Sequence, residues 1–159
     1  GKSIWLFDKY KSKSVISTIS YNNKNLYFGS EDKNLYSIDI NGNEKWKFKT
    51  NGPVSTPSIN KGLVYFGSDD GSFYSLDANT GIERWRFKSG GPIIGSPAIS
   101  EKNIYFGSWD NKLYAINSIN GQKIGEFLTE DVVASPIIYD KTLLFGSWDG
   151  KLYILSDKK

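Results

Sequence analysis

The chain has 159 residues, the size of one domain, and 38% of them are hydrophobic. It contains no His and no Cys, which excludes imidazole bases, Ser-His-Asp triads, thiol nucleophiles, disulfides and thiolate metal sites. The net charge of +3 comes without a block of Lys or Arg, so nucleic-acid binding is not indicated. No apolar run approaches the length of a membrane span. The aromatic content of 15% favours strands over helices.

A repeat of roughly 39 residues runs through the whole chain. Its signature is an apolar segment that ends in Phe-Gly-Ser, and it occurs at 26–30, 64–68, 104–108 and 143–147. Insertions between the copies fall in predicted loops, whereas the spacing from Pro57, Pro97 and Pro136 to the next signature glycine is constant. We therefore expect one domain over 1–159, built from four repeats at about 4–44, 45–83, 84–122 and 123–159.

Each repeat is predicted to form four short antiparallel strands, called A, B, C and D in chain order. In the second repeat they extend over 53–59, 63–68, 73–77 and 83–88. Asp70-Gly71 and Asp149-Gly150 lie between B and C, where they are typical of two-residue hairpin turns with positive φ. A meander of this size is a propeller blade. The sequence therefore predicts an all-β fold, a β-propeller with four blades per chain.

The two ends of the chain complement each other. The last repeat ends on a C strand at 151–155, with no D strand after it. Residues 4–7, Ile-Trp-Leu-Phe, match the D-strand pattern at 46–48 and 85–87. We expect strand 4–7 to complete the last blade, because that removes an unpaired sheet edge. The chain begins at Gly1 and not at Met, which we interpret as a processed form or an excised piece of a longer protein.

The repeated residues carry a family resemblance that covers the whole chain. Tyr-Phe-Gly-Ser, Asp-Gly, Leu-Asp-Ala, Thr-Gly and Trp-Arg-Phe, read along 65–87, resemble the repeat of quinoprotein (pyrroloquinoline-quinone) dehydrogenases and their non-catalytic relatives. The resemblance implies a blade-docking role for Trp5, Trp46 and Trp85 on the D strands. The third blade departs from the pattern, since Gly125 stands in that place and only Phe127 keeps the following aromatic residue. We expect that junction to be the weakest. Trp109-Asp110 and Trp148-Asp149 are superficially similar to WD repeats, but they follow the B strand and no Gly-His partner exists.

The resemblance also sets expectations for assembly and cofactors. Full members of the family typically have eight blades, so either the chain closes as a four-blade disc or two chains form an eight-blade ring. The family precedent favours the ring, a homodimer. The enzymes of the family hold the quinone with Ca²⁺ and use adjacent cysteines. Because this chain has no Cys and half the blades, we expect neither quinone nor Ca²⁺, no metal site and no enzyme activity.

The best candidate binding site is a rim of the predicted channel. Trp109 and Trp148 follow Gly-Ser at the place where the other two repeats have Glu31 and Asp69. This position begins the B–C turn, on the same edge as the loops that join one blade to the next. Tryptophan anchors many binding surfaces, so the pair is a candidate ligand or peptide platform. The alternative is that both rings pack between blades.

Two other charged patterns have ordinary structural explanations. The pairs Glu31-Asp32 and Asp69-Asp70 could approach Ca²⁺, but no spaced ligand loop exists and Asp favours hairpin corners. The D strands alternate Lys and Arg with aromatic residues. On outer edge strands this blocks sheet-to-sheet aggregation, and a phosphate-binding belt is the alternative.

The functional prediction is a non-catalytic scaffold that binds a protein partner through loops on one rim. A ligand-sensing propeller of a larger receptor or kinase is the first alternative, and a fragment of a quinoprotein dehydrogenase is the second. The resemblance includes an outer-membrane assembly scaffold, which favours a location outside the cytoplasm, in the periplasm or at the cell surface.

Overall fold

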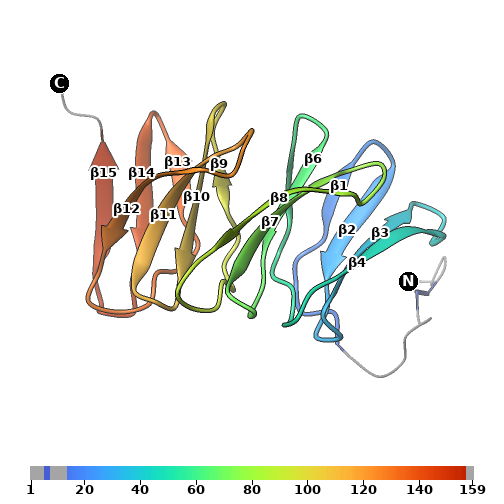
Figure 1. Ribbon diagram of the computed structural model, residues 1–159, viewed down its shortest axis with the longest axis horizontal. Coiled ribbons are helices and arrows are strands. Elements are labelled where there is room, and N and C mark those ends of the chain that lie inside the picture. The colour runs from blue at the N-terminus through green and yellow to red at the C-terminus, as the bar shows by residue number, and fades with distance from the viewer. Residues whose placement is uncertain (1–5, 8–13, 157–159) are drawn as a thin grey trace, which may run out of the picture.

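All regular elements of the described chain are β-strands, arranged as four small sheets side by side (Figure 1). The structure is a computed structural model that describes residues 6–7 and 14–156. The predicted all-β fold with four antiparallel blades is confirmed, and the described part of the last blade has three strands. Blade 1 contains β1 (Ser20–Asn22), β2 (Asn25–Gly29), β3 (Asn34–Asp39) and β4 (Glu44–Lys49); blade 2 contains β5 (Ser58–Asn60), β6 (Leu63–Gly67), β7 (Ser72–Asp77) and β8 (Glu83–Lys88); blade 3 contains β9 (Ala98–Ile99), β10 (Asn103–Ser108), β11 (Lys112–Asn117) and β12 (Lys123–Leu128); blade 4 contains β13 (Ile137–Tyr139), β14 (Thr142–Gly146) and β15 (Leu152–Ser156).

The strands of each blade follow one another as a meander. In blade 2 the B, C and D strands lie within a residue of their predicted bounds. The A strand is shorter than predicted and begins at Ser58. Before this strand, Val54 makes only an isolated bridge to Ser68. Pro57, which directly precedes the strand, has no N–H to donate. The inner strand is thus a short ladder with a looser lead-in.

The B–C turns differ from the expected two-residue type. Positive φ occurs only at their second residue, for example at Gly71 (φ 77°) and not at Asp70. The turn is closed by hydrogen bonds from Gly71 N to Ser68 O (3.0 Å) and from Ser68 N to Ser72 O (3.0 Å). The Asp70 carboxylate accepts from Ser72 N (2.8 Å), which stabilises this longer turn. Two consecutive residues with positive φ occur instead in the A–B turn, at Lys61 and Gly62.

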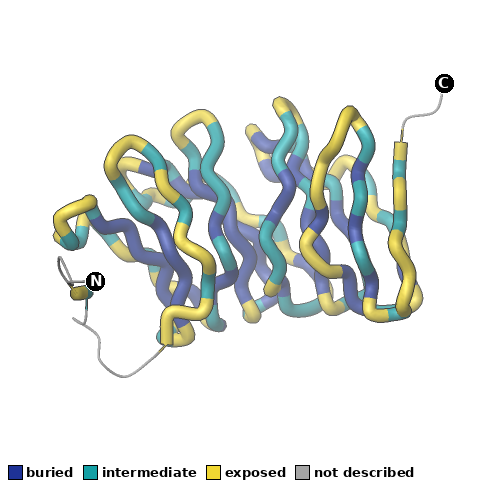
Figure 2. Tube along the Cα trace, turned by 180° about the vertical axis from the view of Figure 1, so that it is seen from behind, coloured by how far each residue is buried: buried dark blue, intermediate teal, exposed yellow. Residues whose placement is uncertain are grey.

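Blades are joined by a repeated aromatic contact. Phe66 on the B strand stacks on Tyr74 opposite it on the C strand, with ring centroids 5.1 Å apart. Phe48, on the D strand of blade 1, meets both rings edge-on at 6.2 and 5.6 Å. The same triad recurs at the next junctions with Phe87 on Phe106 and Tyr114, and with Phe127 on Phe145 and Tyr153. Phe66, Tyr74, Phe106, Tyr114 and Phe145 are buried, and the D-strand phenylalanines and Tyr153 pack against them partly buried. The buried residues lie mainly within the blades, and the exposed ones mainly at the turns (Figure 2).

A second inter-blade contact uses the D-strand tryptophans. Trp46 donates its Nε1 hydrogen to Ala78 O in the next blade (3.0 Å), and its ring lies so close to Gly81 that a Cβ there would be 2.7 Å away. Trp85 makes the equivalent contacts with Ser118 O and Gly121. Trp5 lies outside the described residues. At the third junction Gly125 leaves an apolar hollow of about 230 Å³ instead.

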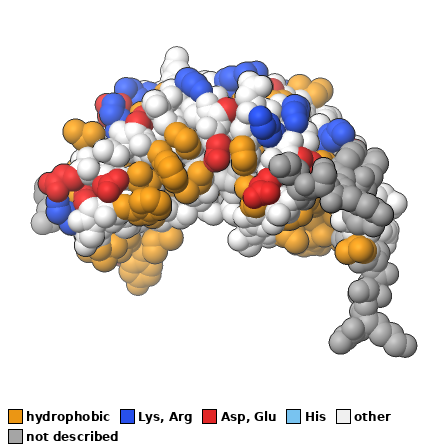
Figure 3. All heavy atoms as spheres, turned by 90° about the horizontal axis from the view of Figure 1, so that it is seen from below, with side chains coloured by type: hydrophobic (Ala, Val, Ile, Leu, Met, Phe, Trp, Pro, Cys, Tyr) orange, Lys and Arg blue, Asp and Glu red, His pale blue; other side chains and the backbone are white. Residues whose placement is uncertain are grey.

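The four blades form an open arch, and its ends lie at opposite extremes of the molecule (Figures 1 and 3). β15 pairs only with β14 among the described strands. Phe7 contacts Phe28 and Tyr36 of blade 1, at the far end from β15. The expected closure of the last blade by the chain's own strand 4–7 is therefore not formed by the described residues 6 and 7, and residues 4 and 5 lie outside the described part. The four blades curve through only part of a circle, so the four-blade disc is not the arrangement in this structure.

Candidate functional site: a tryptophan pair on one edge of the arch

The B–C turns hold one residue of each blade at the same place beside the preceding inter-blade loop. The backbone N–H groups of Trp109 and Trp148 donate to the carbonyls of Pro92 and Val132, each at 2.9 Å. Asp69 N donates to Pro53 O at 2.9 Å, and Glu31 N donates to Ser14 O at 3.0 Å. Each of the four predicted rim residues is therefore pinned in an equivalent position.

Only the two tryptophans come together. Their ring centroids are 5.6 Å apart at an angle of 57°, across the junction of blades 3 and 4. Trp109 is 43% exposed and Trp148 is 63% exposed, so both residues keep a large surface open to solvent. Neither indole N–H has a hydrogen-bond partner within the part of the chain that the structure describes. A large apolar ring with a free donor suits recognition of a partner that is apolar at one end and polar at the other.

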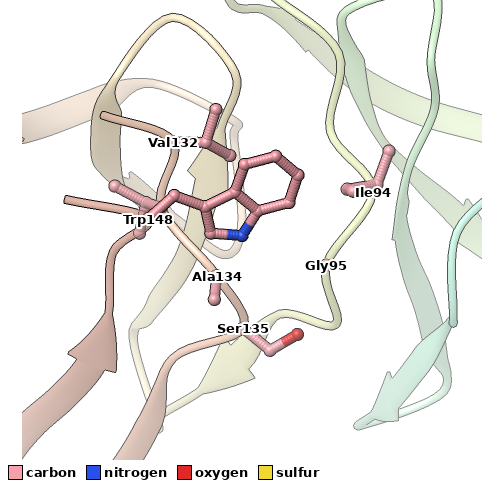
Figure 4. A pocket seen from close by; sticks show the side chains of 7 residues that line it. Ile94, Gly95, Val132, Ala134, Ser135 and Trp148 are labelled. Carbon is pink, nitrogen blue, oxygen red and sulfur yellow. The ribbon is translucent and has the colours of Figure 1, made fainter. Parts of the chain in front are cut away.

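An apolar hollow lies directly beside Trp148. It has a volume of about 200 Å³, and Figure 4 shows the indole extending into the space between the segment at Ile94 and Gly95 and the segment at Val132 to Ser135. The hollow is lined by Ile94, Gly95, Val132, Val133, Ala134, Ser135 and Trp148. Apart from Trp148, these residues precede the A strands β9 and β13, so the hollow belongs to the inner surface of the arch. Sequence reasoning missed them, because nothing local distinguishes this stretch from its copies in the other blades.

The other half of the rim is acidic. Glu31 and Asp69 are exposed and occupy the positions that tryptophan takes in blades 3 and 4. Partial loss of hydration, and then the charge of Asp70, raise the pKa of Asp69. The rim thus changes from carboxylates on blades 1 and 2 to indoles on blades 3 and 4.

The second carboxylate of each turn has a structural role. Asp70 accepts hydrogen bonds from the Tyr74 hydroxyl (2.8 Å) and from Asn51 N in the preceding inter-blade loop (3.0 Å). Burial alone would raise the pKa of Asp70, but its hydrogen bonds with Asn51, Tyr74 and Ser72 outweigh burial and lower it. Asp149 repeats this with Tyr153 and Glu130. Among the described residues, no group of three or more acidic side chains could hold a metal ion.

The basic outer strands are partly neutralised within their own blades. Lys and Arg gather along the convex side of the arch in Figure 3. Arg84 pairs with Asp77, Arg86 with Glu83, and Lys123 with Glu126, each at 2.8 Å. This arrangement favours protection of the sheet edges over a phosphate-binding belt.

Comparisons with known proteins agree with this architecture. A family model described as outer membrane protein assembly factor BamB matches residues 1–157. The chain belongs to this family of PQQ-like repeat propellers. None of the curated proteins compared matches it. No helix of the described PQQ-like chain is long and apolar enough to cross a membrane.

Solved structures show the same fold at low sequence identity. The computationally designed Ika4 protein superposes with a TM-score of 0.88 at 16% identity, and the match covers 98% of both chains. BamB from Moraxella catarrhalis has a TM-score of 0.77 at 18% identity, over 88% of this chain and 46% of that one. The designed Ika8 protein has a TM-score of 0.80 at 17% identity, over 88% and 45%. The PQQ-like chain therefore spans about half the length of BamB and of Ika8.

Proposed function

We propose that this PQQ-like propeller chain is a non-catalytic scaffold that binds a protein partner through the Trp109–Trp148 pair. The observation that carries the proposal is the pair itself: two exposed indoles from adjacent blades meet beside an apolar hollow, and both indole N–H groups are free within the described chain. Exposed aromatic clusters on a rigid framework are typical anchors of protein interfaces.

The geometry favours an extended segment of the partner. An apolar side chain would enter the hollow beside Trp148, and a backbone carbonyl of the same segment would accept from an indole N–H. The hollow is short and open, so it suits one anchor side chain better than a whole folded surface. The rest of the contact would extend along the rim toward Asp69, where a basic residue of the partner would be favourable.

A scaffold role agrees with the family description, which names an assembly factor of outer membrane proteins. We propose that this chain likewise acts outside the cytoplasm. The absence of His and Cys from the sequence supports a role without catalysis or a quinone cofactor. A ligand-sensing propeller is the second candidate, because the same hollow could take a small apolar molecule.

The proposal is tested by peptide selection followed by truncation of the pair. Random peptides of about twelve residues are panned on the wild-type chain, and the selected peptides are titrated by calorimetry. The double variant Trp109→Ala/Trp148→Ala should bind them at least ten-fold more weakly, because interface tryptophans each contribute about 2 kcal/mol or more.

The matched control is Ile82→Ala/Ile119→Ala, which removes two exposed apolar side chains from adjacent blades at the C–D turns on the opposite edge. It should bind as the wild type does. Equal affinity of the tryptophan variant and the wild type would refute the proposed site. Heat on titration with the quinone and Ca²⁺ would refute a cofactor-free role.

A further inference from the structure

Three glycines at one repeat position are required by the neighbouring blade. A Cβ at Gly29 would lie 2.2 Å from Val54 O, one at Gly67 2.2 Å from Ile93 Cγ2, and one at Gly107 2.3 Å from Val133 O. Each close approach is made by the segment that leads into the inner strand of the next blade. At the fourth copy, Gly146, nothing lies within 4 Å, and its φ is outside the left-handed region. The described residues of one chain give no steric reason for glycine there.

The same end of the arch exposes a side chain that is buried elsewhere. Leu152 begins the C strand of blade 4, and its equivalents Leu35, Phe73 and Leu113 are all buried against the following blade. Leu152 is 69% exposed. The forward face of blade 4 therefore has the composition of an inter-blade junction but no following blade in this chain.

The other end of the arch has the complementary features. Val15 corresponds to Val54, Ile93 and Val133, which are buried where they meet the signature glycine of the preceding blade, yet Val15 is 54% exposed. An apolar hollow of about 130 Å³ adjoins it, lined by Phe7, Val15, Ile19, Leu26, Phe28 and Ile38. Blade 1 therefore has an apolar recess on the face that would receive a preceding blade.

Phe7 already occupies the D-strand position of such a blade. It meets Phe28 and Tyr36 edge-on, each at 5.7 Å, as Phe48 meets the stacked pair of blade 2. At the three internal junctions this phenylalanine belongs to the D strand of the preceding blade. The described part of blade 4 ends on its C strand, so a blade 4 placed before blade 1 would have Phe7 in the D-strand position that follows this C strand.

We propose that a second copy of this chain covers both ends, with blade 4 of each copy packed on blade 1 of the other, to form a closed ring of two chains. Gly146 of one copy then meets Val15 of the second copy, and Leu152 enters the recess beside it. A second copy fits these ends because each end matches the other by repeat position, and because BamB and Ika8, which have this fold, are about twice as long. The ring closes on two chains when the four blades of each copy turn through half a circle; any other curvature would give a larger ring or an open filament.

The ring has a consequence that rests on the proposed function: it would carry two Trp109–Trp148 sites, separated by the acidic halves of the rim. The scaffold would then bind two partner segments at once. The ring itself is tested without any partner, so failure of the tryptophan site and failure of the ring give different results.

The test is sedimentation velocity of the full chain at about 1 to 100 µM. The wild type should sediment at twice the mass of one chain. Gly146→Val and Leu152→Glu should each raise the dissociation constant of the dimer at least ten-fold, so that single chains accumulate. The circular dichroism spectrum and the melting of these single chains should match those of the wild-type chain at concentrations where it is dissociated. The controls are Gly125→Val, where a Cβ meets nothing within 4 Å, and Leu128→Glu, whose leucine is 69% exposed like Leu152. Both controls should remain dimeric.

A mixing experiment identifies the geometry. Val15→Asp damages blade 1 and Gly146→Val damages blade 4, so a mixed pair of these chains has one intact junction. Mixing should restore dimers beyond the level of either variant alone. A wild type that is a single chain throughout, dimers that survive Gly146→Val and Leu152→Glu, open polymers, or no gain on mixing would each overturn the proposal. A single chain that binds the other half of a longer protein would give the first of these results.

Discussion

Replacing Gly67 by Ala tests how closely the blades approach. The new Cβ would lie 2.2 Å from Ile93 Cγ2 and 2.6 Å from Ile93 O, whereas carbon atoms in contact prefer about 3.5 to 4.0 Å. The segment at Ile93, which leads into the inner strand of blade 3, would have to retreat by more than about 1 Å along a fully buried contact. Overpacking of this kind costs about 1 to 3 kcal/mol or more, and the higher strand propensity of Ala returns about 0.5 to 1 kcal/mol. We expect a net loss of about 1 to 2 kcal/mol.

The assay is urea unfolding followed by circular dichroism, with Gly125→Ala as the matched control. Gly125 is also a strand glycine, but its Cβ would meet nothing within 4 Å. The control should be as stable as the wild type or up to about 1 kcal/mol more stable. If Gly67→Ala unfolds at the wild-type midpoint, or if both variants lose the same stability, the steric account of the signature glycines is wrong.

Three further predictions concern the junctions and the rim. Gly125→Trp should fill the hollow at the third junction. Burial of about half of the roughly 200 Å² of the new side chain stabilises the fold by ~2–3 kcal/mol, and ordering the side chain costs ~1 kcal/mol. The urea midpoint should therefore rise, and a fall would contradict the packing argument. Burial, and then the hydrogen bond to Asp70, raise the pKa of Tyr74 to about 12 from about 10. Because neutral Tyr74 is favoured in the folded state, its contribution to the free energy of unfolding is complete below about pH 10 and is lost as the pH rises toward 12. Tyr74→Phe should therefore flatten the decline of the urea midpoint between about pH 9 and 12. An unchanged slope would count against this assignment. Trp148→Ala should change thermal stability by less than about 1 kcal/mol, because the ring is mostly exposed; a loss of about 3 to 5 kcal/mol would show that it is a core residue.

Much of each blade could be predicted from the sequence because the signals are local. Apolar alternation and turn residues placed the B, C and D strands of blade 2 within a residue of β6, β7 and β8. The tryptophan pair could be predicted as two rim positions, since both residues follow the same Gly-Ser signature. Their contact at 5.6 Å depends on the spacing of blades 3 and 4, which no local pattern reports.

The missed features have tertiary causes. The B–C turn type depends on Asp70, whose carboxylate accepts hydrogen bonds from Tyr74 and from Asn51 in the loop that precedes the blade. The hollow beside Trp148 is lined by two chain segments about 40 residues apart in sequence, Ile94–Gly95 and Val132–Ser135. Local sequence patterns do not show which side chains from neighbouring blades will meet.

The sequence by itself determined that there are four blades, which strands compose them and which residues lie on the rim, because strand period and turn chemistry act over a few residues. Only the tertiary structure decided the curvature of the arch, the separation of its ends and the exposure of Leu152 and Val15. The physical reason is that curvature results from side chains packed between one sheet and the next. A repeat pattern specifies that such contacts exist, but not the angle at which they place successive blades.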